Sequence, residues 1–256
     1  MIRVGRCKWE RGKRIDPHFE DFTTCVSLTK STTYGSLSPY MLKDSQGRIL
    51  ENVWQFSKVY QRVPDVTQAR SRYDTTIIWR WPAETHASDI QFNEEGQAVS
   101  ASLNSKYFNW RKSGMNAPEP IRYPVGYHHR HKCLFCLHED VNDTNNADYQ
   151  ALTYIPSRKK LYLPMYVEAV VKAPQFKHLK AKLERGENVL IAEVDGPHQE
   201  SLDYYIKEYG VSEDFIQDDT MLATYENLNI MLEDPKHPFG HGYCLALALL
   251  GYNNGI

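Results

Sequence analysis

The chain has 256 residues, of which 41% are hydrophobic and 24% charged, so it is long enough and apolar enough to bury a core of its own. Its formal net charge of −2 excludes a global attraction to nucleic acid or to an anionic membrane. The longest apolar run, residues 244–250, is too short to span a bilayer. Five cysteines, an odd number, and an N-terminus without a signal peptide predict reduced thiols and a cytoplasmic protein.

The first quarter of the chain alternates strand and turn signals before a helix. An alternating run at 24–28 predicts a strand, and the turn-forming residues at 34–39 predict a loop. Residues 44–48 have the composition of a hairpin turn. Apolar residues then recur at helical spacing, so we predict a helix over 51–60.

The middle of the chain carries weaker patterns. Residues 76–79 are apolar and predict a buried strand, whereas 89–106 is polar and predicts an inserted surface segment. The Asn- and Asp-rich stretch 139–148 predicts a flexible loop. The apolar stretch 162–171 fits either a strand or a helix.

The last third has the clearest elements. Residues 175–185 have helical periodicity that ends before a C′ glycine, and 189–194 predicts a buried strand. Two further helices are expected at 220–233 and 241–250. Without an internal repeat or a low-complexity linker, we predict a single domain. Its insertions lie near 62–120 and 196–235.

The segment from residue 34 to residue 58 carries the most informative motif. It combines an aromatic–glycine turn, a Ser–Pro step, a short Asp/Gly turn and a helix that opens with Glu. A Gln follows that Glu after four positions and a Lys after seven. The motif residues are Tyr34, Gly35, Leu37, Ser38, Pro39, Asp44, Gly47, Glu51, Gln55 and Lys58. This segment resembles the N-terminal half of the NADAR (NAD and ADP-ribose related, YbiA-like) superfamily, whose members hydrolyse N-glycosidic bonds of ADP-ribose-like substrates.

The spacing of Glu51, Gln55 and Lys58 places all three on one face of a helix. A carboxylate, an amide and an ammonium would then line one wall of a pocket. Glu51 lies in the first turn, where the helix dipole favours its charged form. The alternative is a solvated helix face with an ordinary charge pair.

Two later segments, 165–195 and 239–247, look like further blocks of the same family. In those blocks a helix leads to a strand that ends in Glu, and a glycine-rich turn opens a last apolar helix. The Trp–Gly step of the family is absent here, so its conserved acid matches either Asp195 or Asp234. The resemblance covers about half the chain and implies an α+β fold with helices around a small mixed sheet.

The resemblance implies chemistry at an oxocarbenium-like ribose carbon, where a carboxylate stabilises charge or activates water. Glu51 would lie at the ribose, and Lys58 would position it or act as a nucleophile. Asp195 would complete the catalytic set. The implied substrate-binding residues are Tyr34, Gly35, Ser38, Trp54, Gln55, Arg130, Lys132, His198, Asp234, Gly240 and Gly242. The family's pocket tryptophan matches either Trp110 or Tyr154.

The segment 127–136 is unusually rich in basic, His and Cys residues. It predicts a cationic wall for phosphate or nucleic acid, formed by Arg122, Arg130 and Lys132. A zinc site is disfavoured, because Cys133 and Cys136 have no second Cys pair and would point to opposite faces of a strand. An ordinary strand with a basic face is the third interpretation. We therefore predict no metal and no cofactor.

His198 follows the predicted strand at 189–194 and can take part in acid–base chemistry or cap the helix near Ser201. His237 and His241 raise the same question. We predict an N-glycosidase acting on an ADP-ribosylated nucleobase or a related ribosylated base, with nucleic acid as a possible partner and no membrane association. The alternatives are a DNA glycosylase, which would need a basic rim for base flipping, and a non-catalytic ADP-ribose or nucleotide binder.

Overall fold

The computed structural model describes residues 1–29, 32–64, 70, 74–122, 133–141 and 149–252. It divides into two compact units. Unit 1 comprises Met1–Leu42 and Leu163–Ile256, and unit 2 comprises Lys43–Tyr162. No helix in the described part of the chain is long and apolar enough to cross a membrane. The prediction of a single domain stays a prediction.

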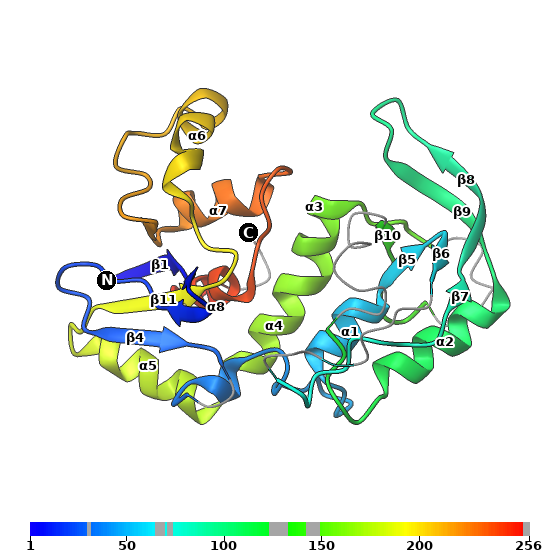
Figure 1. Cartoon of the computed structure of the whole chain (residues 1–256), viewed down its shortest axis with the longest axis horizontal. Coiled ribbons are helices and arrows are strands. Elements are labelled where there is room, and N and C mark those ends of the chain that lie inside the picture. The colour runs from blue at the N-terminus through cyan, green and yellow to red at the C-terminus, as the bar shows by residue number, and fades with distance from the viewer. Residues whose placement is uncertain (30–31, 65–69, 71–73, 123–132, 142–148, 253–256) are drawn as a thin grey trace. The chain divides into compact units, whose positions relative to one another are not determined.

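Unit 1 is built on a four-stranded sheet in the order β12-β1-β11-β4. Its strands are β1 (Ile2–Arg6), β4 (Thr24–Ser27), β11 (Val189–Glu193) and β12 (Thr220–Leu222). Strand β11 runs parallel to both β1 and β4, whereas β12 is antiparallel to β1, and Figure 1 shows β1, β11 and β4 side by side. All five residues of β11 are buried, as expected for a central strand that is covered on both faces.

Helices of unit 1 cover this sheet. Helix α8 packs against β1 and β11, and α4, α5 and α7 pack against α8. All but the first residue of α8 are buried, which explains why its sequence is apolar on every side. The helical elements are η1 (Gly35–Leu37), α4 (Leu163–Val170), α5 (Pro174–Glu184), η4 (Gln199–Ser201), α6 (Leu202–Tyr209), α7 (Tyr225–Glu233) and α8 (His241–Leu249). A short exposed hairpin joins β2 (Lys8–Glu10) to β3 (Lys13–Ile15).

Unit 2 packs short helices against small two-stranded sheets. Its elements are α1 (Leu50–Phe56), β5 (Lys58–Tyr60), β6 (Arg62–Val63), β7 (Glu84–Thr85), β8 (Ala87–Phe92), β9 (Ala98–Leu103), α2 (Ser105–Met115), β10 (Cys133–Cys136), α3 (Tyr154–Ser157) and the π-helix η3 (Arg158–Tyr162). Helix α1 packs on α2 at Gly114, where a Cβ atom would lie 2.0 Å from the Phe56 ring. The Phe56 and Trp110 rings, 4.6 Å apart, continue this contact into an aromatic core.

Several elements agree with the sequence. The strand at 24–28 is β4, the helix at 175–185 is α5, and the apolar helix at 241–250 is α8. Gly186 follows α5 with φ +85°, as predicted for a C′ glycine. The turn at 44–48 is also present, because Lys43 pairs with Ile49 in an antiparallel bridge.

Two predicted helices were too long. The helix at 51–60 ends at Phe56, and Lys58–Tyr60 forms β5, which pairs with β10. The helix at 220–233 likewise begins only at Tyr225, because Thr220–Leu222 forms β12 on the sheet of unit 1. In both segments, pairing with a strand distant in sequence outweighs helical periodicity.

In the middle of the chain, the structure differs more from the predicted elements. Residues 76–79 form no strand and are not buried; Ile78 alone makes isolated bridges, to Arg70 and Ile121. The predicted insertion at 89–106 is mostly the β8–β9 hairpin, whose polar residues point outward. The stretch at 162–171 is helix α4. Most of the predicted loop at 139–148 lies outside the described residues.

Candidate functional site

Glu51, Gln55 and Lys58 form a hydrogen-bonded chain in unit 2. Gln55 Nε2 donates to Glu51 Oε1 over 2.7 Å, and Lys58 Nζ donates to Gln55 Oε1 over 2.9 Å. Helix α1 places Glu51 and Gln55 one turn apart, and each is only 6% exposed. Lys58 does not continue the helix as predicted; it is the first residue of β5. The three side chains nevertheless lie together, because the strand begins immediately after the helix ends.

An aromatic pair borders this chain. The Trp54 and Tyr162 rings lie 4.9 Å apart, and Lys58 Nζ lies 5.0 Å from the Trp54 ring. The ammonium therefore contacts both an amide oxygen and a ring face, an arrangement that holds a cation in place. Tyr162 comes from the π-helix Arg158–Tyr162, a type of element that is frequent at functional sites.

The two candidates for the family's pocket tryptophan have other roles in unit 2. Trp110 is buried, packs on Phe56, and donates from Nε1 to Pro82 O over 2.8 Å. Tyr154 is exposed, and the Arg158 guanidinium lies 3.9 Å from its ring. By position, Trp54 is therefore the aromatic residue that accompanies Glu51.

Cys133 and Cys136 lie beside Lys58. We expected the two thiols on opposite faces of a strand, but a β-bulge between Cys133 and Phe135 shifts the register and brings them together. The hydrogen bond from Cys133 lowers the pKa of Cys136 against the effect of burial, and the Lys58 charge contributes. Both thiols are free. No three His, Cys, Asp or Glu residues in the described part of the chain are grouped to hold a metal ion.

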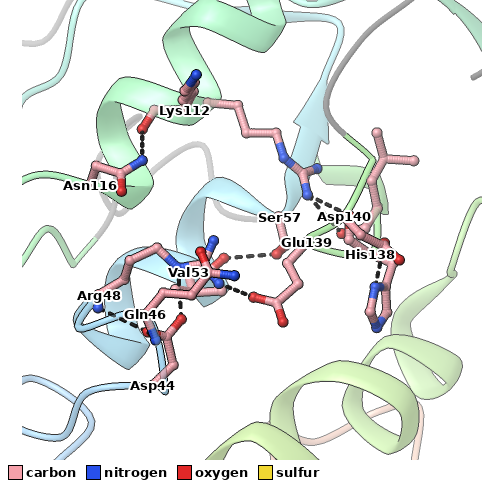
Figure 2. A network of polar contacts seen from close by, with 12 residues as sticks. Asp44, Gln46, Arg48, Val53, Ser57, Lys112, Asn116, His138, Glu139 and Asp140 are labelled. Carbon is pink, nitrogen blue, oxygen red and sulfur yellow. Dashed lines mark hydrogen bonds and ion pairs between the residues drawn. The ribbon is translucent and has the colours of Figure 1, made fainter. Parts of the chain in front are cut away.

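A polar network fixes the start of α1. Figure 2 shows Asp44 and Arg48 on the turn that precedes the helix, with Glu139 pointing toward them. Arg48 Nε lies 2.7 Å from Asp44 Oδ2, and the same guanidinium pairs with Glu139. The backbone carbonyl of Ser57, at the end of α1, accepts a hydrogen bond from Leu137 N over 2.8 Å. Both ends of the helix that carries Glu51 are thus tied to the segment after β10.

Unit 2 also contains a cavity of about 400 Å³. Its lining residues are His138, Asp140, Val141, Tyr149, Gln150, Leu152 and Lys160. Glu51, Gln55 and Lys58 do not line this cavity. The hydrogen bonds, rather than this cavity, therefore identify the candidate site.

The predicted residues of the aromatic–glycine turn lie in unit 1. Tyr34 is buried and directly precedes η1, and the carbonyl of Leu37 in this short helix accepts a hydrogen bond from Tyr166 over 2.7 Å. Ser38 is buried and accepts through Oγ from Tyr40 N over 3.3 Å. A common site of these residues with Glu51 would join the two units and stays a prediction.

Gly240 and Gly242 make room for a carboxylate of the protein. A Cβ atom at Gly240 would lie 2.4 Å from Glu193 Cδ, and one at Gly242 would lie 2.8 Å from Glu193 Oε2. Gly242 N donates to Glu193 Oε2 over 2.6 Å, and Asp195 N donates to Glu193 Oε1 over 3.2 Å. The buried Glu193 therefore occupies the start of α8, where the resemblance implied that Gly240 and Gly242 bind substrate. The sequence indicated Glu193 only as the Glu that ends a strand, not as a residue of a site.

Asp195 and His198 lie in the segment that follows β11. Both are half-buried. Burial, followed by the Arg6 charge, lowers the pKa of His198. Its Nδ1 lies 4.0 Å from Glu200 Oε2, and its side chain does not cap η4. The predicted capping role is therefore wrong, and a role in acid–base chemistry stays a prediction.

Asp234 is fully buried in unit 1. Its Oδ1 accepts from Lys236 N and Tyr204 OH over 2.8 and 3.0 Å, and its Oδ2 accepts from Tyr205 OH over 2.7 Å. His237 Nδ1 lies 2.6 Å from the same Oδ2. Burial alone would raise the pKa of Asp234, but these hydrogen bonds outweigh it and the pKa is lowered. The carboxylate faces protein donors rather than solvent.

The remaining predicted phosphate-binding residues, Arg130 and Lys132, lie outside the described residues, as do the histidines at 128, 129 and 131. Arg122 is described and is exposed. In comparisons with known proteins, no family model matches the chain, and neither curated proteins nor solved structures give a significant match.

Proposed function

We propose that the chain hydrolyses the N-glycosidic bond of an ADP-ribosylated nucleobase or a related ribosylated base. The observation that carries the proposal is the buried Glu51 carboxylate, hydrogen-bonded to Gln55, which in turn accepts from Lys58. A buried acid with an oriented partner is a recurrent feature of sites that stabilise positive charge on a sugar. On this proposal the mixed α/β fold is that of the YbiA-like proteins, and the protein acts in the cytoplasm.

Each residue of the hydrogen-bonded chain Glu51–Gln55–Lys58, and Trp54 beside it, has a part in the proposed reaction. Glu51 stabilises the oxocarbenium-like ribose carbon or activates the attacking water. Gln55 fixes the orientation of that carboxylate through its amide. Lys58 holds Gln55 from the other side and so positions Glu51 through it. Trp54, whose ring contacts Tyr162 and Lys58, is the aromatic residue that we assign to contact the leaving base.

Of the two acids that the resemblance offers, Asp195 is better suited than Asp234 to contact a ligand. Asp195 is half-buried and lies in the turn after β11, whereas Asp234 is 0% exposed. An acid that contacts a ligand must offer its oxygens to it, and both Asp234 oxygens accept hydrogen bonds from the protein. Arg130 and Lys132 keep their proposed role at the phosphates.

The test is release of ADP-ribose from an oligonucleotide carrying ADP-ribosylated guanine, followed by mass spectrometry. We expect release by the wild type and a loss of about 10²-fold or more in Glu51→Gln, the usual contribution of an acid–base group. The matched control is Glu94→Gln, which neutralises an exposed carboxylate of the same unit and leaves release unchanged.

Three results would contradict the proposal. Retention of release in Glu51→Gln would remove Glu51 from the chemistry. Saturable ADP-ribose binding without turnover would indicate a binder. Formation of an abasic site that ADP-ribose does not inhibit would indicate a glycosylase for modified bases.

A further inference from the structure

Three residues of unit 1 form a linear chain that the N-glycosidase proposal does not use. Ser201 Oγ lies 3.2 Å from His237 Nε2, and His237 Nδ1 lies 2.6 Å from Asp234 Oδ2. The two ring nitrogens of the histidine are thus engaged on opposite sides, one by a hydroxyl and the other by a carboxylate. This is the connectivity of a nucleophilic serine, its general base and the acid that orients the base.

The fold brings the three residues together from two separate segments. Asp234 ends α7 in an extended conformation, as expected for a residue before proline, and accepts from Lys236 N in a tight turn. The turn returns the chain so that His237 reaches back to Asp234. Ser201 arrives from η4, directly before the first residue of α6.

The protonation states follow from the partners of Asp234. An ionised carboxylate only accepts hydrogen bonds, so His237 carries its proton on Nδ1 and donates it to Asp234. Its Nε2 then has a lone pair that accepts from the Ser201 hydroxyl. Tyr205 OH donates to the same Asp234 oxygen and lies 3.1 Å from His237 Nδ1, which further fixes the ring.

The acid of this triad is buried, whereas the histidine and the serine are both partly exposed. Asp234 is 0% exposed, the His237 side chain is 21% exposed, and Ser201 is half-buried. Ser201 occupies the N-cap position of α6 but makes no side-chain cap. Its backbone continues from η4 with φ −92° and ψ −3°, and its hydroxyl lies within hydrogen-bond distance of His237.

Other histidines of the described chain contact acids without this arrangement. His138 pairs with Asp140 over 2.5 Å at the surface, and His198 lies 4.0 Å from Glu200. His237 differs because its acid is buried and its ring packs against Tyr204 and Tyr205, with centroids 5.1 and 5.3 Å away. The ring is thereby held in the orientation that a general base requires.

We propose that Ser201, His237 and Asp234 form a second catalytic site, which hydrolyses carboxylic esters. Ser201 Oγ attacks the ester carbonyl carbon while its proton passes to His237 Nε2. The tetrahedral adduct collapses, the carbon–oxygen bond to the alcohol breaks, and the alcohol leaves with that proton. Water then attacks the acyl-serine with His237 as base, which releases the carboxylic acid and restores the hydroxyl. Asp234 is the positioning residue, because it acts through His237.

The first experiment tests whether the Ser201 hydroxyl is an activated nucleophile. The full-length wild-type protein is incubated with a fluorophosphonate, which captures activated serines, and the adduct is located by peptide mass spectrometry. We expect one adduct, on Ser201, and none in Ser201→Ala or His237→Gln. Ser212→Ala is the matched control, since Ser212 is an exposed serine whose hydroxyl pairs with Asp214, and labelling should persist in it. A wild type without an adduct on Ser201, or equal labelling of Ser212, would overturn the proposal.

The second experiment follows turnover of p-nitrophenyl acetate and tests Asp234 by its effect on the pH profile. Asp234→Asn presents an amide N–H to His237 and so favours the wrong tautomer, which should lower the rate at pH 7 by about 10³-fold or more. The midpoint of the pH–rate curve should change, because Asp234 contacts the histidine that acts as the base. Loss of folding alone would not move this midpoint, so an unchanged midpoint would assign Asp234 a structural role only. The assay contains no ADP-ribose, so its result is independent of the N-glycosidase test.

Discussion

The two units hold their buried carboxylates in different ways. In unit 1, Glu193 accepts from the backbone N–H groups of Asp195 and Gly242, and Asp234 accepts from the backbone of Lys236 as well as from side chains. In unit 2, Glu51 accepts from the side-chain amide of Gln55. Backbone donors are fixed by the fold, whereas a side-chain amide can rotate about its own bonds.

This difference separates two uses of a buried acid. A carboxylate held by fixed donors is preorganised, and replacing it costs free energy. Such a carboxylate can hold the start of a helix, as Glu193 does, or orient a histidine, as Asp234 does. A carboxylate held by a movable amide can change its partner when a ligand arrives. The comparison predicts that acid-to-amide substitutions destabilise the protein more in unit 1 than in unit 2.

The largest effect is expected for Glu193→Gln. The new amide must place an NH2 group against one of two backbone donors, because neither Gly242 N nor Asp195 N can move away. We expect a loss of about 3 kcal/mol in the free energy of unfolding, the upper range for an unsatisfied partner of a buried charged group. Urea unfolding followed by circular dichroism measures it.

The control for Glu193 is Glu187→Gln. Glu187 is a half-exposed acid that pairs with Lys182 and Arg185, so its neutralisation should change stability by less than about 1 kcal/mol. Equal losses in the two variants would show that the fixed backbone donors of Glu193 contribute nothing special.

A second prediction concerns the pH dependence of stability, which differs between the two units. Burial lowers the pKa of His86 in unit 2 from 6.5 to about 3, and its Nδ1 accepts from Tyr60 N. The folded state therefore keeps the imidazole neutral while the unfolded state takes up a proton. Stability is complete above pH 6.5 and falls below it by about 1.4 kcal/mol per pH unit, which makes about 2 kcal/mol at pH 5. Asp234 in unit 1 has a lowered pKa, so its contribution is lost only below its ordinary value of 3.8.

Tryptophan fluorescence can follow this loss in unit 2, because four of the five tryptophans lie there: Trp54, Trp79, Trp81 and Trp110. Urea unfolding at pH 7.5 and pH 5 should show the decrease in the wild type. His86→Gln, which keeps an acceptor for Tyr60 N, should show a smaller pH dependence. An identical pH dependence in both proteins would mean that His86 is not the titrating group.

The extent to which sequence predicted the fold follows from how local each signal is. Helix α5, strand β11 and helix α8 carry their periodicity and their end signals within a few residues, and they were predicted well. Strands β5 and β12 were not, because each depends on a partner strand far away in the chain. Propensity cannot supply that information when the segment is only three residues long.

The candidate sites, like the secondary structure, were predicted where the signal is local in the sequence. The hydrogen-bonded chain from Glu51 to Lys58 spans seven positions, so the spacing together with the family resemblance indicated it, even though Lys58 proved to be in a strand. Ser201 and His237 are 36 positions apart, and their contact appears only once the turn after α7 is folded. His237 was noticed in the sequence, but Asp234, three positions before it, was expected to bind substrate, and Ser201 could not be paired with it from spacing.

The smallest effect, and the most direct test of the comparison, is Glu51→Gln. Gln55 can continue to donate its NH2 group to the carbonyl oxygen of the new amide, because an amide keeps one oxygen acceptor. We expect a loss of about 1 kcal/mol in the free energy of unfolding, the net value of an ordinary hydrogen bond. Unfolding in urea, followed by tryptophan fluorescence, measures the change. A loss as large as that of Glu193→Gln would mean that Glu51 is held as rigidly as the acids of unit 1. In that case the amide would not be a movable partner, and the loss of ADP-ribose release in this variant would no longer separate chemistry from folding.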